Sequence, residues 1–171
     1  METDTRILRQ GAEMSHPALV PETPLDFGVR VNRGPLRYPN WVQGLRHPEL
    51  HAAGPAEYDL STGVAGWVAK EQERRGGIKA GAVYERFVQA DLLLPSLSLA
   101  DLLAIQAKGL EVFLALYAGK SVLAWRSMAR GHGGCWRIPC LELEEEDGEL
   151  LLKWVSLRQE LTMRHPALLF K

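Results

Sequence analysis

The segment 120–140 gathers basic residues without a single Asp or Glu: it contains Lys120, Arg126, Arg130 and Arg137. The sequence predicts a three-stranded sheet for this part of the chain. Side chains alternate between the faces of such a sheet, and one face then carries Arg126, Arg130, Arg137 and Arg158 around Trp154. Guanidinium groups beside an indole suit phosphate contact with base stacking, and would equally suit an acidic protein surface. The alternative is that the arginine stems only shield a solvated face. A one-residue slip in register would break up the cluster.

A second aromatic and basic stretch lies in residues 30–51, where Glu49 is the only acid. Its candidate binding residues are Arg33, Arg37, Tyr38, Trp41 and Arg46. If this stretch is mobile, its charges and rings are expected to contact nucleic acid. If it is packed, the aromatic residues anchor it to the rest of the chain.

One alternative chemistry is thiol catalysis, with Cys135 as nucleophile and His132 as base across a glycine-rich turn. No third, orienting residue accompanies this pair. A zinc site is not expected, because Cys135 and Cys140 lie an odd number of residues apart on one strand and point to opposite faces. The usual phosphate-loop, dinucleotide, metalloprotease and hydrolase motifs are missing. We therefore expect no metal and no cofactor. The missing motifs favour a protein that is not an enzyme.

The elements that position these residues are strands 121–130, 135–144 and 150–158. Asp147-Gly148 between two β-prone runs predicts a hairpin, because both central residues of its turn reach positive φ. With that turn, Glu142 faces Lys153 and Ile138 faces Leu157. With His132-Gly133 as the first turn, Trp136 faces Ala129. The three strands form an antiparallel meander.

Three helices are predicted ahead of the meander, over 62–75, 81–91 and 99–118. Ser98 and Asp101 resemble a capping box at the start of the third helix, which is the longest. The apolar face of the meander, with Trp136, Ile138 and Cys140, is expected to seat this helix. The predicted class is α+β, with the meander packed on the longest helix.

Residues 1–60 are predicted to form a proline-rich arm that is partly docked on a single α+β domain at 61–171. Seven of the ten prolines, at positions 17, 21, 24, 35, 39, 48 and 55, fall in this part of the chain. Proline fixes φ and lacks an amide donor, so it favours extended, irregular structure.

Composition limits the function classes further. The 171 residues include 20 Lys plus Arg and 21 Asp plus Glu, for a net charge of -1, so no global charge attracts polyanions. Two cysteines are too few for a disulfide scaffold. No signal-like start and no long apolar run are seen, so we expect a cytoplasmic protein with no membrane contact.

These observations favour a small, non-enzymatic binding or accessory protein that contacts nucleic acid or an acidic protein surface through its Arg-rich sheet face. Two alternatives remain: a small thiol-dependent hydrolase or transferase centred on Cys135 and His132, and an assembly subunit that packs through its arm as a homo- or hetero-oligomer.

Overall fold

The computed structural model describes residues 23–73 and 76–171 of the chain. Its elements, in chain order, are β1 (Gly28–Arg30), β2 (Gly44–Leu45), η1 (Pro48–Leu50), β3 (Glu57–Asp59), α1 (Leu60–Gly63), β4 (Val64–Trp67), η2 (Lys70–Gln72), β5 (Ile78–Lys79), α2 (Ala80–Gln89), α3 (Leu99–Lys108), α4 (Leu110–Tyr117), β6 (Val122–Leu123), η3 (Trp125–Ser127), β7 (Ala129–Arg130), η4 (His132–Gly134), β8 (Trp136–Glu144), β9 (Glu149–Ser156), β10 (Glu160–Leu161) and β11 (Ala167–Phe170).

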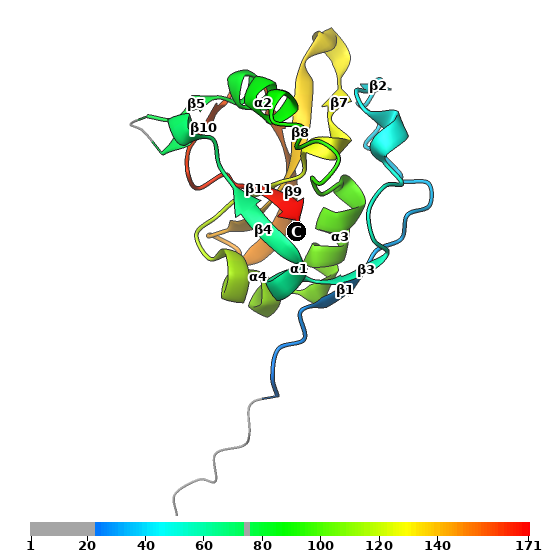
Figure 1. Cartoon of the computed structure of the whole chain (residues 1–171), viewed down its shortest axis with the longest axis vertical. Helices are drawn as coiled ribbons and strands as arrows, with labels where there is room; N and C mark the ends of the chain where they lie inside the picture. The colour runs from blue at the N-terminus through cyan, green and yellow to red at the C-terminus, as the bar shows by residue number, and fades with distance from the viewer. Residues whose placement is uncertain (1–22, 74–75) are drawn as a thin grey trace, which may run out of the picture.

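A curled, mixed sheet of seven strands forms the centre of the molecule (Figure 1). One edge of β8 pairs with both β7 and β6, and its opposite edge pairs with β9. The sheet continues from β7 to β2, and from β6 through β11 to β4. All pairs are antiparallel except β6 with β11. Two further pairs, β1 with β3 and β5 with β10, lie outside this sheet. The prediction of a three-stranded meander is therefore wrong, because β4, β11 and β2 extend the sheet well beyond it.

Helices cover both faces of the sheet (Figure 1). On one face, residues of α3 and α4 pack with Leu141 and Leu168. On the other, Val83 and Phe87 of α2 pack with Ile138 and Cys140. The apolar face predicted to seat the longest helix is thus covered by α2. The face predicted to be Arg-rich is covered by α3 and α4, because β8 and β9 carry Leu141 and Leu152 on that face.

The predicted helix 99–118 is two helices, separated at Gly109 with φ 96° and ψ 172°. Its start is confirmed: Ser98 N–H donates to the Asp101 carboxylate at 2.8 Å, which is the expected capping box. Helix 81–91 corresponds to α2. The predicted helix 62–75 is wrong, because Val64–Trp67 pairs with β11 as strand β4. Apolar residues at helical spacing there also satisfy the period of a short strand.

The predicted strand 121–130 is interrupted. Strands β6 and β7 both lie along the same edge of β8, and the 3-10 turn η3 separates them. The turn into β8 is also longer than predicted, because Gly133 and Gly134 both have positive φ. Arg130 therefore pairs with Trp136, and Ala129 with Arg137. This is the one-residue slip that moves Arg130 to the other face of the sheet.

The second hairpin is observed, with a different turn. Glu144 pairs with Glu149, so four residues form the turn, and Glu142 faces Leu151 where Lys153 was predicted. A shift of two residues leaves every side chain of β9 on its predicted face.

The part of the arm that the structure describes lies against the body. Val29 of β1 and Val31 are buried, with 4% of their surface exposed. Strand β2 joins the central sheet through β7. Residues 1–22 of the predicted arm lie outside the described residues. Among those that are described, no helix is both long enough and apolar enough to cross a membrane.

Candidate functional site: an arginine–aromatic end of the sheet

One end of the central sheet is built from β2, β7 and the start of β8. Two backbone hydrogen bonds extend the β2–β7 pair on both sides: Gln43 N–H to Arg130 O at 2.8 Å, and Arg46 N–H to Met128 O at 3.0 Å. These bonds fix the backbone from which Arg46 and Arg130 project. Arg137 projects from β8 on the opposite face, because it pairs with Ala129 and not with Arg130.

Three exposed arginines at this end each lie over an aromatic ring. The Arg46 guanidinium carbon is 5.0 Å from the ring centre of Tyr84 and 5.2 Å from that of Trp136. Arg130 lies 5.7 Å from the same Trp136 ring, and Arg137 lies 5.3 Å from the ring of Trp41. Such cation–π contacts attract a guanidinium to the face of the ring. We name this group the arginine–aromatic end: Arg46, Arg130, Arg137, Trp41, Tyr84 and Trp136.

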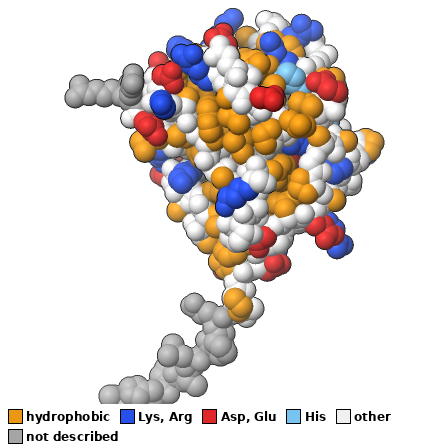
Figure 2. Space-filling view, viewed as in Figure 1, with side chains coloured by type: hydrophobic (Ala, Val, Ile, Leu, Met, Phe, Trp, Pro, Cys, Tyr) orange, Lys and Arg blue, Asp and Glu red, His pale blue; other side chains and the backbone are white. Residues whose placement is uncertain are grey.

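The arginine–aromatic end carries charge of one sign. Residues 120–141 contain no acid, and residues 31–56 contain only Glu49. Within the described part of the chain, Arg46, Arg130 and Arg137 form no ion pair, whereas other cations such as Arg30, Lys79 and Arg86 are paired with carboxylates. On the face in Figure 2, basic and acidic side chains are interspersed around a band of hydrophobic ones.

Trp154 does not offer the open stacking surface predicted for it. Its ring meets Trp41 edge-on, with ring centres 5.1 Å apart, and lies 6.3 Å from the ring of Tyr38. Trp41 in turn packs on the backbone of Gly131, where a Cβ would come within 2.9 Å of the indole. Trp41 and Tyr38 therefore cover Trp154, and only glycine fits at position 131.

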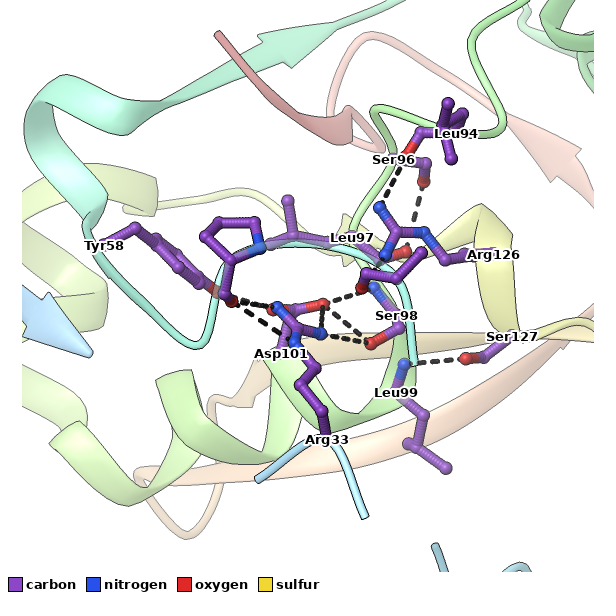
Figure 3. Close-up of polar contacts among 12 residues, drawn as sticks. Arg33, Tyr58, Leu94, Ser96, Leu97, Ser98, Leu99, Asp101, Arg126 and Ser127 are labelled. Atoms are coloured by element: carbon purple, nitrogen blue, oxygen red, sulfur yellow. Dashed lines mark hydrogen bonds and ion pairs between the residues drawn. The ribbon is translucent and has the colours of Figure 1, made fainter. Parts of the chain in front are cut away.

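Arg126 is not at the surface. It is fully buried, and its guanidinium donates to the carbonyls of Ala53 and Leu94 (Figure 3). Burial lowers the pKa of this guanidinium, and the nearby Asp101 carboxylate opposes that shift. Its Nε has no hydrogen-bond partner among the described residues. The expectation that Arg126 contacts an anion is therefore wrong, because its donors hold two internal loops together.

The Arg33 guanidinium also makes its hydrogen bonds inside the molecule (Figure 3). It makes two hydrogen bonds with the Asp101 carboxylate, at 2.9 and 2.7 Å, and donates to Pro55 O. Asp101 is fully buried and accepts a further bond from the Tyr58 hydroxyl at 2.9 Å. Burial, together with the Asp101 charge, raises the pKa of Tyr58. This group joins the described part of the arm to the start of α3.

The remaining predicted residues lie apart from these networks. Arg37 is exposed, and Arg158 is exposed in the turn after β9. The Tyr38 hydroxyl lies 2.6 Å from Nδ1 of His51, whose pKa burial lowers. Of the arginines predicted on one sheet face, Arg130 and Arg137 lie at the same end of the sheet but on opposite faces. Arg126 lies in the interior.

The thiol alternative receives no geometric support. Nδ1 of His132 accepts a hydrogen bond from the Gln43 side chain at 2.7 Å, and no bond links His132 to Cys135 in the described structure. Cys140 is buried, which raises the pKa of its thiol to about 12. Across residues 23–73 and 76–171, no cluster of three or more His, Cys, Asp or Glu side chains is placed to hold a metal ion.

Sequence reasoning missed Tyr84 and Trp136 as partners of Arg46. The alternation pattern predicts Trp136 on an apolar face, and the proline-rich composition predicts Arg46 in a separate arm. One sequence feature links Arg46 with Trp136: they lie in the two stretches that nearly lack acids, 31–56 and 120–141, which β2 and β7 bring together, whereas Tyr84 lies in neither stretch. No known protein family, curated protein or solved structure shows a significant match to this chain.

Proposed function

We propose that the protein is a small binding protein whose arginine–aromatic end takes up single-stranded nucleic acid. The observation that carries the proposal is the set of three exposed guanidinium groups, each held over a ring and none paired with a carboxylate in the described chain. A guanidinium donates in a planar fork that matches phosphate oxygens.

Nucleic acid is favoured over an acidic protein segment because of how these groups are presented. Each guanidinium has N–H edges that suit phosphate, and the aromatic rings beside it suit base stacking. A carboxylate of an acidic protein would use the edges alone. Bases that stack in this way must be unpaired, which favours a single strand over a duplex.

The test is binding of a fluorescently labelled single-stranded oligonucleotide at low and moderate salt. Three phosphate contacts predict that the logarithm of affinity falls against the logarithm of salt with a slope of roughly -2. In the triple variant Arg46→Gln, Arg130→Gln, Arg137→Gln, both the affinity and this slope are expected to fall.

The matched control is the triple variant Arg30→Gln, Lys79→Gln, Arg86→Gln. It removes the same charge from exposed cations that are already paired with Glu57, Glu160 and Glu71. It should retain most of the binding. Equal losses in the two triple variants would refute the assigned site. Salt-sensitive binding of polyglutamate as tight as that of the oligonucleotide would indicate an acidic protein partner in its place.

We also propose a cytoplasmic location. Cys135 and Cys140 are both free thiols, which suits a reducing compartment. Fractionation of host cells, with antibody detection of the native chain, tests this proposal. Recovery from an extracytoplasmic fraction would contradict it.

A further inference from the structure

The arginine–aromatic end divides into two clusters on opposite faces of the sheet. Arg130 of β7 pairs with Trp136 of β8 on one side and with Gly44 of β2 on the other. Paired residues, and residues two apart in one strand, lie on the same face, so Arg46 shares this face. Tyr84 of α2 completes the group, because the Arg46 guanidinium lies over its ring. We call Arg46, Arg130, Trp136 and Tyr84 the α2-side cluster.

The second cluster lies on the face that α3 and α4 cover. Arg137 follows Trp136 directly in β8, so its side chain points to the opposite face. Its guanidinium carbon is 5.3 Å from the ring centre of Trp41. Trp154 supports Trp41 from this same face, because its partner in the ladder is Pro139, two residues beyond Arg137. We call Arg137 and Trp41 the α3-side cluster.

The turn between β7 and β8 lies at the end of the sheet, between the two clusters. It projects at the top of the molecule in Figure 1. His132, Gly133 and Gly134 in this turn are exposed. A Cβ at Gly133 or Gly134 would meet no atom of the described residues within 4 Å. A ligand can therefore approach the backbone of this tip closely, because the two glycines carry no side chain that would keep it away.

The segment that joins the clusters repels no polyanion. Residues 120–141 contain no Asp or Glu, and the side chain that binds His132 at the tip is the neutral Gln43. In the α2-side cluster, Arg46 and Arg130 lie 5.2 and 5.7 Å from the centre of one ring, that of Trp136. Like charges gathered in this way repel each other, and a phosphate bound by both would stabilise them.

We propose that one single strand of nucleic acid crosses the tip of the β7–β8 hairpin and contacts both clusters. The ligand of the proposed function, on which this inference rests, is then one continuous strand that bends from one face of the sheet to the other. A duplex is too stiff for this path, because its persistence length is about 150 base pairs. Contact with one cluster raises the effective concentration of the strand at the other cluster.

Stoichiometry and matched single variants test the crossing. The probe is a labelled strand of about 12 nucleotides, within the roughly 4–16 nucleotides that known single-strand folds cover. A titration should give one strand per chain. Arg130→Gln and Arg137→Gln each remove one charge from one cluster, and each should lower the affinity about tenfold because charge-assisted contacts to phosphate are lost. The control Arg86→Gln removes a charge that is paired with Glu71 and should retain the affinity.

The outcomes separate this inference from the proposed function. Two strands per chain, or a loss of affinity in only one of the two cluster variants, would overturn the crossing while the proposed function stands. If the native chain shows no salt-sensitive binding, both are refuted.

Photocross-linking locates the strand on the protein. The probe is the shortest strand that reaches full affinity, with one 4-thiouracil base at its centre. Tandem mass spectrometry should find the cross-link at the tip, in residues 131–135. The same base at either end should cross-link to one of the two clusters. Cross-links from the central base that fall on one cluster and not on the tip would contradict the proposed path.

Discussion

Asp101 compensates two positively charged side chains inside the protein. It accepts two hydrogen bonds from Arg33, lies close enough to Arg126 to affect its pKa, and has no exposed surface. Removal of one partner from a buried ion pair leaves the other charge desolvated and uncompensated. This carboxylate is therefore expected to be the most sensitive single position in the described arm–body contact.

We predict that Asp101→Asn lowers the free energy of unfolding by about 3–5 kcal/mol, because it leaves two buried guanidinium groups without a counter-charge. Urea denaturation followed by tryptophan fluorescence measures this loss. Tyr58→Phe removes a single hydrogen bond to the same carboxylate and should cost about 1–2 kcal/mol.

The control for this prediction is Glu57→Gln. It breaks an ion pair with Arg30 in which 84% and 64% of the two side chains are exposed. Exposed pairs contribute about 0–1 kcal/mol. If Asp101→Asn cost no more than Glu57→Gln, the buried network would not be holding the arm.

At the scale of elements, Gly109 decides that residues 99–117 form two helices. Its φ of 96° with ψ of 172° is a conformation that only glycine adopts readily. A Cβ there would meet no other atom within 4 Å, so any cost of substitution comes from the backbone and not from a clash.

We predict that Gly109→Ala destabilises the protein by about 1–3 kcal/mol through backbone strain. Urea denaturation measures the cost. Gly81→Ala is the matched control, because Gly81 lies in α2 with 3.5 Å to the nearest contact and should be neutral or slightly stabilising. An unchanged stability for Gly109→Ala would show that α3 and α4 do not need the break.

How far the sequence predicts the elements depends on whether their signals are local. Helix α2, the cap at Ser98 and the β8–β9 hairpin follow from residues near one another in the chain, and the structure contains all three. Strands β4 and β11 were missed because each is only four residues long and their pairing joins segments about a hundred residues apart. The sequence shows that Gly109 is an unfavourable residue inside a helix, but it does not show that the chain forms two separate helices there.

The candidate site shows the same limit. Composition located the basic, acid-poor stretches, but the sidedness of Arg126 and Arg130 depended on register. The turn η3 and the longer turn at Gly133 and Gly134 changed that register, and neither has a strong local signal. Alternation arguments fail wherever an unseen irregularity enters a strand.

At the scale of the whole molecule, burial of three histidines makes stability depend on pH. Burial lowers the pKa of His47, His51 and His165 from the ordinary value of 6.5. The unfolded chain binds protons at these sites more readily than the folded chain. Their contribution to stability is therefore full above pH 6.5 and is lost as pH falls below it toward the folded-state pKa values.

We predict that the free energy of unfolding is smaller at pH 5.5 than at pH 7.5, as measured by urea denaturation at both values. Replacement of His51 by Phe should reduce this difference, because it removes one of the three groups. His132→Phe is the control, since that side chain is exposed. A native chain whose stability rises on acidification would contradict the argument.

The position of β11 has a consequence for how the protein is made. This strand joins β4 to β6, which have no direct pairing with each other, yet it follows both in the chain. During translation, the backbone groups of β4 that pair with β11 therefore lack these partners until every intervening residue has been synthesised. A nascent chain held in this state is a natural client for chaperones, and stalling just before residue 167 should favour aggregation.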